Sequence, residues 1–215
     1  MPVDAKICGL KTAETVDAAV SGGAFMIGFN FFARSPRYLS PALAGELGKR
    51  VPASTGRVGL VVDAGDDEIA AILNEARLDL LQLHGKETPD RVAAVKARFG
   101  LPVMKVISVA EAADIASARA YEDVADRLMF DTKPPKSMSN ALPGGNAISF
   151  DWSLLRGQSF GLPWMLAGGL HAGNLAQAVK ATGAPAVDTS SGVEDRPGKK
   201  SINKIKEFLA IAQSL

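Results

Sequence analysis

Short apolar segments alternate with longer segments of helical periodicity along almost the whole chain. Eight runs rich in Val, Ile, Leu and Phe have the length and composition of buried parallel strands. These runs cover residues 3–8, 25–30, 57–62, 78–83, 103–107, 127–130, 163–167 and 185–188. The segments between them predict helices over residues 13–21, 41–50, 67–76, 89–99, 109–120, 151–155, 172–182 and 200–212. The uninterrupted alternation predicts a parallel sheet built from strand–helix units.

Eight strand–helix units are the number that closes a (β/α)8 barrel, the TIM barrel of the α/β class. We therefore expect residues 1–215 to form a single barrel domain. An open flavodoxin-like sheet would use about five strands and leave the others unplaced. The length is near the small end for a barrel, so most loops must be short. Two longer loops, 31–40 and 132–150, follow predicted strands at the face where barrel active sites lie.

Composition and charge narrow the class of protein. The chain has 47% hydrophobic residues, 22% charged residues and a net charge of +1, which is typical of a globular protein and excludes a disordered, collagen-like or disulfide-rich one. Its near-neutral charge gives no global field to attract nucleic acid or an anionic membrane. No apolar run approaches the length of a membrane span, and the first residues carry no secretory signal. One cysteine and two histidines give no disulfide and no zinc-site spacing, so we expect a cytoplasmic protein without a structural metal.

Two side chains with proton-transfer chemistry end predicted strands. Strand alternation places Lys6 and Cys8 on the inner face of the barrel, with Cys8 at its mouth. A nearby ammonium would raise the thiolate fraction of a thiol whose ordinary pKa is about 8.5, so Cys8 could serve as a general base. Asp131 shares its inward parity with Met129, and burial beside apolar neighbours would keep it protonated as a general acid. A small buried hydrophobe and a turn-forming carboxylate are the alternative interpretations of these two residues.

Two adjacent turns have the composition of a phosphate site. Gly168 and Gly169 follow the seventh predicted strand, and Ser190, Ser191 and Gly192 follow the eighth. These are the two positions that hold phosphate in many barrels. Glycine lets backbone N–H groups approach an oxyanion, and a following helix N-terminus adds a favourable dipole. One such turn would be weak evidence because glycine is common there, but the two together predict a phosphate site.

Three further polar residues are candidates for substrate binding. Arg37 lies in the long loop after the second strand, where its planar fork could bind a carboxylate, unless it is simply a solvated loop residue. His84 and Asp188 end strands with mouth-facing parity, and each could orient a substrate or satisfy loop groups. Asp151 and His171 stand at the start of predicted helices, and we assign them no chemistry.

Taken in order, these motifs resemble those of the phosphoribosylanthranilate isomerase family of tryptophan biosynthesis. The matching segments are KICG at 6–9, GF at 28–29, SPR at 35–37, QLHG at 82–85, DTK at 131–133, FDW at 150–152, GGL at 168–170, the aspartate at 188, SSGVE at 190–194 and PGKK at 197–200. Each motif alone is weak. Their order, and their positions at strand ends over nearly the whole chain, make the match specific.

The resemblance implies a (β/α)8 barrel that converts N-(5-phosphoribosyl)anthranilate to 1-(2-carboxyphenylamino)-1-deoxyribulose 5-phosphate by an Amadori rearrangement, with no cofactor. It implies that Asp131 is the general acid, that Cys8 is the general base and that Arg37 binds the anthranilate carboxylate. It also places the phosphate at the loops after strands seven and eight. The ligand is then a small phosphorylated molecule, with nucleic acid and membrane partners not expected, and both a monomer and a homodimer are compatible with the pattern. Ala147 stands where the family often has a further glycine before the FDW segment. If glycine there serves loop flexibility, alanine would alter closure of that loop over the substrate.

Two alternatives belong to other functional classes. Another phosphosugar barrel, such as an aldolase, an epimerase or an indole-glycerol-phosphate synthase, would share the phosphate loops. A Schiff-base aldolase would need a strand lysine, for which Lys105 is the candidate, but it would leave Cys8 and Asp131 unexplained. A catalytically silent barrel that binds a phosphorylated metabolite or a partner enzyme is the third hypothesis, and the presence of both proton-transfer residues argues against it.

Overall fold

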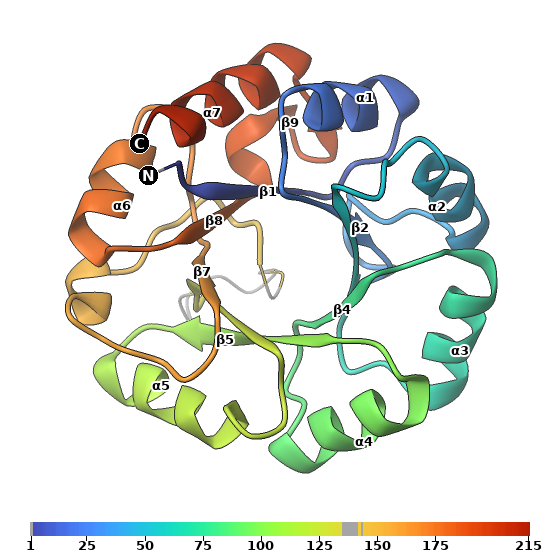
Figure 1. The fold of residues 1–215 in the computed structure, drawn as a ribbon, viewed down its shortest axis with the longest axis horizontal. Coiled ribbons are helices and arrows are strands. Elements are labelled where there is room, and N and C mark those ends of the chain that lie inside the picture. The colour runs from blue at the N-terminus through green and yellow to red at the C-terminus, as the bar shows by residue number, and fades with distance from the viewer. Residues whose placement is uncertain (1, 135–141, 143) are drawn as a thin grey trace.

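Eight parallel strands close into a barrel in the computed structural model, which describes residues 2–134, 142 and 144–215 (Figure 1). The strands follow one another around the ring in chain order, and β1 pairs with both β2 and β8. Their bounds are β1 Asp4–Cys8, β2 Met26–Asn30, β3 Gly56–Val61, β4 Leu80–Leu83, β5 Val103–Val109, β6 Arg127–Thr132, β7 Trp164–Leu166 and β8 Ala186–Thr189. The predicted (β/α)8 architecture is confirmed.

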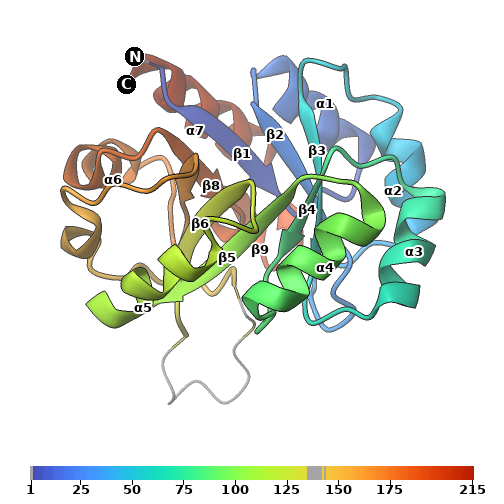
Figure 2. The same cartoon turned by 60° about the horizontal axis from the view of Figure 1, so that its bottom comes forward.

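Helices cover the outside of the barrel (Figures 1 and 2). Their bounds are α1 Ala13–Ser21, α2 Pro41–Gly48, α3 Asp66–Glu75, α4 Pro89–Phe99, α5 Ala112–Ser117, α6 Leu175–Thr182 and α7 Ile202–Ser214, with 3-10 turns η1 Ala118–Tyr121, η2 Trp152–Leu155 and η3 Ser191–Val193. Local chemistry sets several of these limits. Ser40 and Thr88 cap the two helices that begin with proline, and α4 ends at Gly100, whose φ of 65° is left-handed.

Two predicted helices have different limits in the structure. The segment 109–120 is divided, because Val109 pairs with Thr132 and so belongs to β5, while the end of the segment forms the 3-10 turn η1. The helix expected from residue 172 begins only at Leu175. The residues before it form a turn in which the Asn174 side chain accepts a hydrogen bond from the His171 backbone N–H. The other helices begin and end within about two residues of their expected limits, as is usual at frayed ends.

The barrel has two apolar layers. One fills the interior and consists of Met26, Val58, Leu80, Met104, Val106, Met129, Met165, Ala167 and Ala186. The other lies between the strands and the helices and includes Ile7, Ile27, Phe29, Leu81 and Phe130. Successive strand residues therefore alternate between these layers. Towards the carboxyl ends of the strands, the side chains that face inward are polar instead of apolar.

A short hairpin after β8 is absent from the prediction. Strands β9 Glu194–Arg196 and β10 Lys199–Lys200 pair antiparallel across a turn in which Gly198 has a φ of 79°. The Pro197–Gly198 dipeptide is the sequence signal for this turn. The predicted long loop 132–150 falls partly outside the described residues. In the part of the chain that the structure describes, no helix is long and apolar enough to cross a membrane.

Candidate active site

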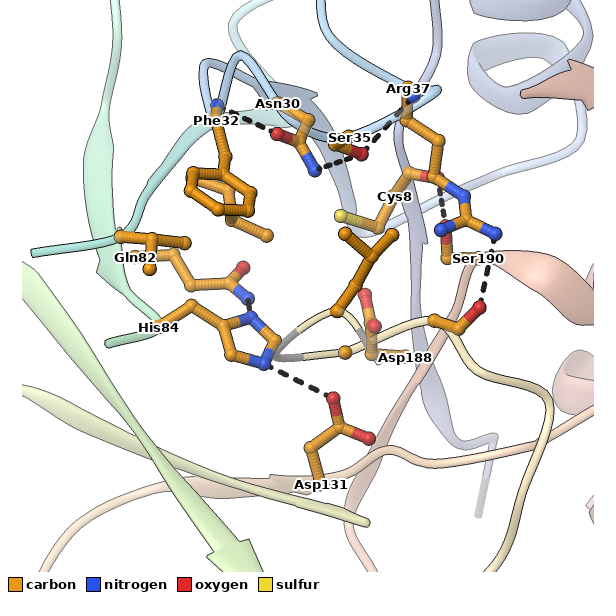
Figure 3. A pocket seen from close by; sticks show the side chains of 15 residues that line it. Cys8, Asn30, Phe32, Ser35, Arg37, Gln82, His84, Asp131, Asp188 and Ser190 are labelled. Carbon is orange, nitrogen blue, oxygen red and sulfur yellow. Dashed lines mark hydrogen bonds and ion pairs between the residues drawn. The ribbon is translucent and has the colours of Figure 1, made fainter. Parts of the chain in front are cut away.

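A cavity opens at the carboxyl ends of the strands, with about 450 Å³ of space that includes open solvent at its mouth (Figure 3). The residues that line it come from six strands (β1, β2, β3, β4, β6 and β8) and from the loops that follow several of them, above all those after β2 and β6. Its polar lining includes Cys8, Arg37, His84, Asp131, Asp188 and Ser190. The structure thus brings together both proposed proton-transfer residues and all three residues expected to bind substrate.

Cys8 is the last residue of β1, and its side chain lies in the cavity wall (Figure 3). The Lys6 ammonium is fully buried and donates a hydrogen bond of 2.7 Å to Asp188 Oδ1. Gly28 on the neighbouring strand leaves room for both groups, because a Cβ there would come within 2.9 Å of Cys8 Sγ and 3.2 Å of Lys6 Nζ. This close approach gives the GF motif at 28–29 a structural reason.

The charge environment of Cys8 differs from the sequence expectation. Burial raises the pKa of the thiol, and the negative charge of Asp188 raises it further, while Lys6 and Lys200 lower it. The net pKa is above its ordinary value, so the empty site favours the neutral thiol. The expected rise in thiolate fraction is wrong, because burial outweighs the effect of the ammonium. For Lys6 the balance is reversed. Burial lowers its pKa, but Asp188 and Cys8 together raise it above its ordinary value.

Asp131 enters the cavity from β6, on the opposite side from Cys8, and contacts His84. His84 Nε2 lies 3.2 Å from Asp131 Oδ2, and the other carboxylate oxygen accepts a hydrogen bond of 2.7 Å from the Thr132 backbone N–H. Gln82 Nε2 lies 3.1 Å from His84 Nδ1. If the amide donates this bond, the neutral ring carries its proton on Nε2, the atom beside Asp131. Within the described residues Nε2 makes no hydrogen bond, so this N–H lies near the carboxylate without being aligned to it.

Arg37 reaches the cavity from the loop after β2, but much of its guanidinium is already bound. Its Nε and Nη2 atoms donate to Glu194 at 2.8 Å and 2.9 Å, and Nη2 also donates to the Gly145 carbonyl at 3.2 Å. Both charged side chains are about 95% buried. Within the described part of the chain, the hydrogen bonds leave Nη1 without an acceptor. A substrate carboxylate would therefore meet the Nη1 edge of Arg37 and not the Nε–Nη2 fork that Glu194 occupies.

The β9–β10 hairpin supplies residues that the sequence analysis quoted without a role. Glu194 also accepts a hydrogen bond of 2.9 Å from Lys200 Nζ, which donates in addition to Ser190 O and Oγ. Burial lowers the pKa of Lys200 to about 8, although Glu194 opposes the shift. For Glu194, burial raises the pKa, but Arg37 and Lys200 outweigh it and hold the pKa below its usual range. The sequence signal for this contact is the Pro197–Gly198 turn, which brings Glu194 and Lys200, on either side of it, together.

The loops after β7 and β8 lie against each other, as a phosphate site shared between them requires. Thr189 Oγ1 donates to the Leu170 carbonyl at 2.7 Å, and a Cβ on Gly192 would collide with the same carbonyl. Gly168 and Gly169 have φ values of 91° and 63°. These left-handed conformations favour glycine.

The five predicted phosphate-binding residues do not all line one cavity. Ser190 lines the main cavity and donates a hydrogen bond of 3.1 Å to the Cys8 carbonyl. Gly168 and Gly169 line a small adjoining cavity that also contains Asp131. Ser191 and Gly192 begin the 3-10 turn η3 and line neither of these two cavities in the described structure. Their assignment to phosphate rests on their place in the loop, and it stays a prediction.

The end of the loop after β6 crosses the cavity. A Cβ on Gly144 would come within 2.7 Å of His84 Cε1, and one on Gly145 would collide with Arg37 Nη1. Ala147, where the family often has glycine, has a φ of 58° and so adopts the left-handed conformation that glycine prefers. Asn146, next to it, bonds through its side chain to both backbone groups of Leu142.

The structure does not support the aldolase alternative. Met104 and Val106 fill the barrel interior, so Lys105 between them points outward, and its ammonium pairs with Glu87 at 2.6 Å. A lysine in this position cannot reach a substrate in the cavity. Asp151 caps η2 by accepting a hydrogen bond from Ser153, as expected of a helix-start residue. His171 belongs to the turn before α6.

Comparisons with known proteins agree with this geometry. The model of the N-(5′-phosphoribosyl)anthranilate (PRA) isomerase family matches residues 5–210. The N-(5′-phosphoribosyl)anthranilate isomerase of Rhodospirillum centenum is 55% identical over 215 residues, which is all of both chains. A solved phosphoribosyl anthranilate isomerase in complex with reduced 1-(o-carboxyphenylamino)-1-deoxyribulose 5-phosphate is 31% identical, with a TM-score of 0.83 over 99% of this chain and 100% of the other.

A second solved structure has the same degree of likeness. It holds monomers of the dimeric phosphoribosylanthranilate isomerase from Thermotoga maritima, with 32% identity and a TM-score of 0.83 over 99% of this chain and 100% of that one. The family model and the full-length relative cover the strands that carry Cys8, Asp131 and Asp188. On this evidence, the chain belongs to the N-(5′-phosphoribosyl)anthranilate isomerase family.

Proposed function

We propose that this chain converts N-(5′-phosphoribosyl)anthranilate to 1-(2-carboxyphenylamino)-1-deoxyribulose 5-phosphate, the isomerisation step of tryptophan biosynthesis, with Cys8 as base and Asp131 as acid. The observation that carries the residue roles is their position. The two side chains enter one cavity from β1 and β6, which are three strands apart around the barrel, in a chain of this family. A substrate between them can receive a proton on one side and lose one on the other.

Asp131 performs the first proton transfer in this proposal. Its carboxyl group protonates the furanose ring oxygen, the bond from that oxygen to C1′ breaks, and the anthranilate nitrogen supplies the electron pair that forms a Schiff base. Asp131 is then ionised. The Thr132 N–H, 2.7 Å from Oδ1, lies where it stabilises that charge, and His84 Nε2 is 3.2 Å from Oδ2.

Cys8 performs the second transfer. Its thiolate removes the proton from C2′, and the electrons of the C–H bond move to give an enolamine. Loss of the proton on O2′ and addition of a proton at C1′ then produce the ketone, so the overall reaction is an isomerisation. Because burial raises the pKa of the thiol, the active thiolate is a minor form of the empty site at neutral pH. Lys6 and Lys200 are the charges that oppose this effect.

The remaining groups bind the substrate. Arg37 is proposed to bind the anthranilate carboxylate through Nη1, since Glu194 occupies its other edge. His84 and Asp188 line the same cavity and are proposed to contact the substrate beside the reacting carbons. The phosphate is assigned to the loops after β7 and β8, that is to Gly168, Gly169, Ser190, Ser191 and Gly192.

The proposal extends to the setting in which the protein works. A base that is a free thiol needs a reducing compartment, which supports a cytoplasmic location. The mechanism uses side chains alone, so we expect a chelator to leave turnover unchanged. The ligand is a small phosphorylated molecule, and no nucleic-acid partner is proposed. Both a monomer and a homodimer are compatible with the proposal.

The first experiment follows the loss of fluorescence when freshly prepared N-(5′-phosphoribosyl)anthranilate is mixed with the protein. We expect Cys8→Ser and Asp131→Asn each to lower kcat by about 10²- to 10⁴-fold, the usual contribution of one proton-transfer group. Asp151→Asn is the matched control, because the same substitution is made at a helix cap outside the cavity, where Asn is an equally good cap. Decay by the wild type no faster than spontaneous hydrolysis would refute the proposed function. Near wild-type turnover in both variants would refute the residue roles.

A further inference from the structure

A buried ion pair that the mechanism does not use lies just outside the barrel wall. Lys105 Nζ is 2.6 Å from Glu87 Oε2, and each side chain is only 3% exposed. Lys105 lies on β5 and points into the layer between the strands and the helices. Tyr121 of η1 closes this layer, with its hydroxyl 3.0 Å from the Glu87 carbonyl and its ring centroid 5.8 Å from Lys105 Nζ. Neither charge reaches the cavity that holds Cys8 and Asp131.

The Lys105–Glu87 pair holds the backbone next to His84. Lys105 Nζ donates to the Gly85 carbonyl at 2.8 Å, and Glu87 accepts hydrogen bonds from the Gly85 N–H at 3.0 Å and 3.1 Å. Both backbone polar groups of Gly85 are therefore bound by the pair. Glu87 also accepts a hydrogen bond of 2.9 Å from the Asp63 N–H, so the pair joins the loops after β3 and β4. A Cβ on Gly85 would collide with Asp63, which shows how closely the two loops pack.

His84 is held on both sides as a result. Its own N–H donates to the Val61 carbonyl of β3 at 2.9 Å, and the next residue is held by the Lys105–Glu87 pair. The ring between these anchors lies 3.1 Å from Gln82 Nε2 and 3.2 Å from Asp131 Oδ2. A displacement of the backbone by about 1 Å would separate the ring from the carboxylate, and displacements of that size in an active site are known to slow catalysis strongly.

We propose that Lys105 and Glu87 are positioning residues that set His84 against Asp131, which rests on the proposed role of Asp131 as general acid. Stability alone does not account for the pair. Removing two charges from water is costly, and an apolar pair of similar volume is often as stable or more so. What an apolar pair cannot supply is the set of directed hydrogen bonds to both backbone groups of Gly85. The ion pair therefore specifies the conformation of the loop that carries His84.

The test uses the double variant Lys105→Met/Glu87→Leu, because either single change would leave a buried charge without its partner. The matched control is Lys96→Met/Asp126→Leu. That ion pair, at 2.8 Å, also holds a backbone N–H, that of Val103, but at the opposite end of the barrel from the cavity. Thermal unfolding of both variants establishes that each is folded before any comparison is made.

The first readout does not depend on activity. The chain has two histidines, so a proton NMR spectrum contains two Cε1–H signals, and His84→Ala identifies which one belongs to His84. We expect the double variant to shift the His84 signal, while the His171 signal stays in place as an internal reference. The control variant should move neither signal. An unmoved His84 signal in the folded double variant would overturn the proposal.

The second readout is turnover of N-(5′-phosphoribosyl)anthranilate. We expect the double variant to lower kcat by roughly 10- to 100-fold with KM within about twofold, because the pair acts on proton transfer and not on substrate binding. In a His84→Ala background the same double change should have no further effect on kcat. An equal fall in kcat in both backgrounds would show that the pair does not act through His84. If the wild type itself fails to isomerise the substrate, the proposed function fails, and the NMR readout still decides the positioning role.

Discussion

The Cys8 thiol has two opposing influences around it, and their balance decides its chemistry. Burial and Asp188 favour the neutral form, and Lys6 and Lys200 favour the thiolate. Since burial is the largest of these effects, the pKa is raised, and folding favours the protonated thiol. The resulting contribution to the free energy of unfolding is complete below the ordinary thiol pKa. It is lost as the pH rises through the higher pKa of the folded state.

Alkylation by iodoacetamide tests this balance, because Cys8 is the only cysteine and the thiolate is the reacting form. We expect the rate to rise with pH and to reach half its maximum at a higher pH in the native protein than in the protein unfolded by urea. Mass spectrometry of samples quenched between about pH 7 and 11 measures both profiles, and the unfolded sample is the control. A native profile displaced to lower pH would contradict the raised pKa.

Ala147 offers a second prediction at the scale of one residue. Its φ of 58° is left-handed, a conformation that is unfavourable for alanine by about 1–2 kcal/mol and easy for glycine. Glycine also loses more conformational entropy on folding, so we expect Ala147→Gly to raise the free energy of unfolding by only about 0.5–1 kcal/mol. Urea unfolding measures the change. Ala113→Gly in the exposed part of α5 is the control and should lower the free energy by a similar amount. Destabilisation by both would contradict the argument.

Inward-facing site residues could be predicted one by one, because strand alternation determines which side chains face the barrel interior. Cys8, Asp131 and Asp188 all stand at positions whose parity follows from the apolar run before them. Alternation does not indicate partners. That Arg37 is bound by Glu194, far away in the chain, and that burial outweighs Lys6 at Cys8 depend on how segments meet in space. Lys105 shows the same limit, since its partner lies on the loop after the neighbouring strand.

At the scale of elements, the β9–β10 hairpin connects the last loop of the barrel to the loop after β2. Glu194 at its start binds both Arg37 and Lys200, so one carboxylate pairs with two buried cations. This explains why a hairpin of so few residues occupies the mouth of the barrel. It places a negative charge where Arg37 would otherwise be free to move.

We expect Glu194→Gln to lower the free energy of unfolding by about 3 kcal/mol, because a buried cation loses its charge partner. Adding Lys200→Met should recover part of this loss, since one of the two cations is then absent. Urea unfolding at pH 7 of the wild type, both single variants and the double variant completes the cycle. The control is Glu46→Gln, whose ion pair with Lys49 is about 70% exposed and should contribute nothing measurable. Strictly additive effects of the Glu194 and Lys200 changes would contradict an interaction between these two side chains.

The centres of the barrel strands were predictable from apolar runs, but their ends and the hairpin were not. Val109 belongs to β5 because it pairs with Thr132, and pairing is a property of two strands in register. The segments that form β9 and β10 contain charged residues and no apolar alternation, so the Pro197–Gly198 turn is their only local signal.

At the scale of the whole molecule, the barrel closes where the first strand meets the last. Lys6 and Asp188 are directly opposite each other in this pairing, and their buried ion pair lies across it. Both charges are removed from water only when β1 and β8 come together. The pair therefore joins the closure of the barrel to the floor of the active-site cavity.

We expect Lys6→Met to lower the free energy of unfolding by about 3–5 kcal/mol, because it leaves Asp188 buried without its partner. The double variant Lys6→Met/Asp188→Leu should be considerably more stable than Lys6→Met alone, since an apolar pair fills the same space without a charge. Chemical unfolding of the three proteins compares them, with the half-exposed Arg50–Asp17 pair changed to Met and Leu as a control. If the double variant were the least stable of all, the ion pair would contribute more to stability than the free energy lost in burying its charges.

The same closure has a consequence for how the protein is made. A ribosome releases the chain from its N-terminus, so Cys8 emerges with the first strand, whereas Asp188 and Ser190 emerge only with the last. Until then the thiol lacks the carboxylate that raises its pKa, and the Cys8 carbonyl lacks the hydrogen bond that Ser190 donates to it. No truncated product that stops short of residue 190 can contain a complete cavity.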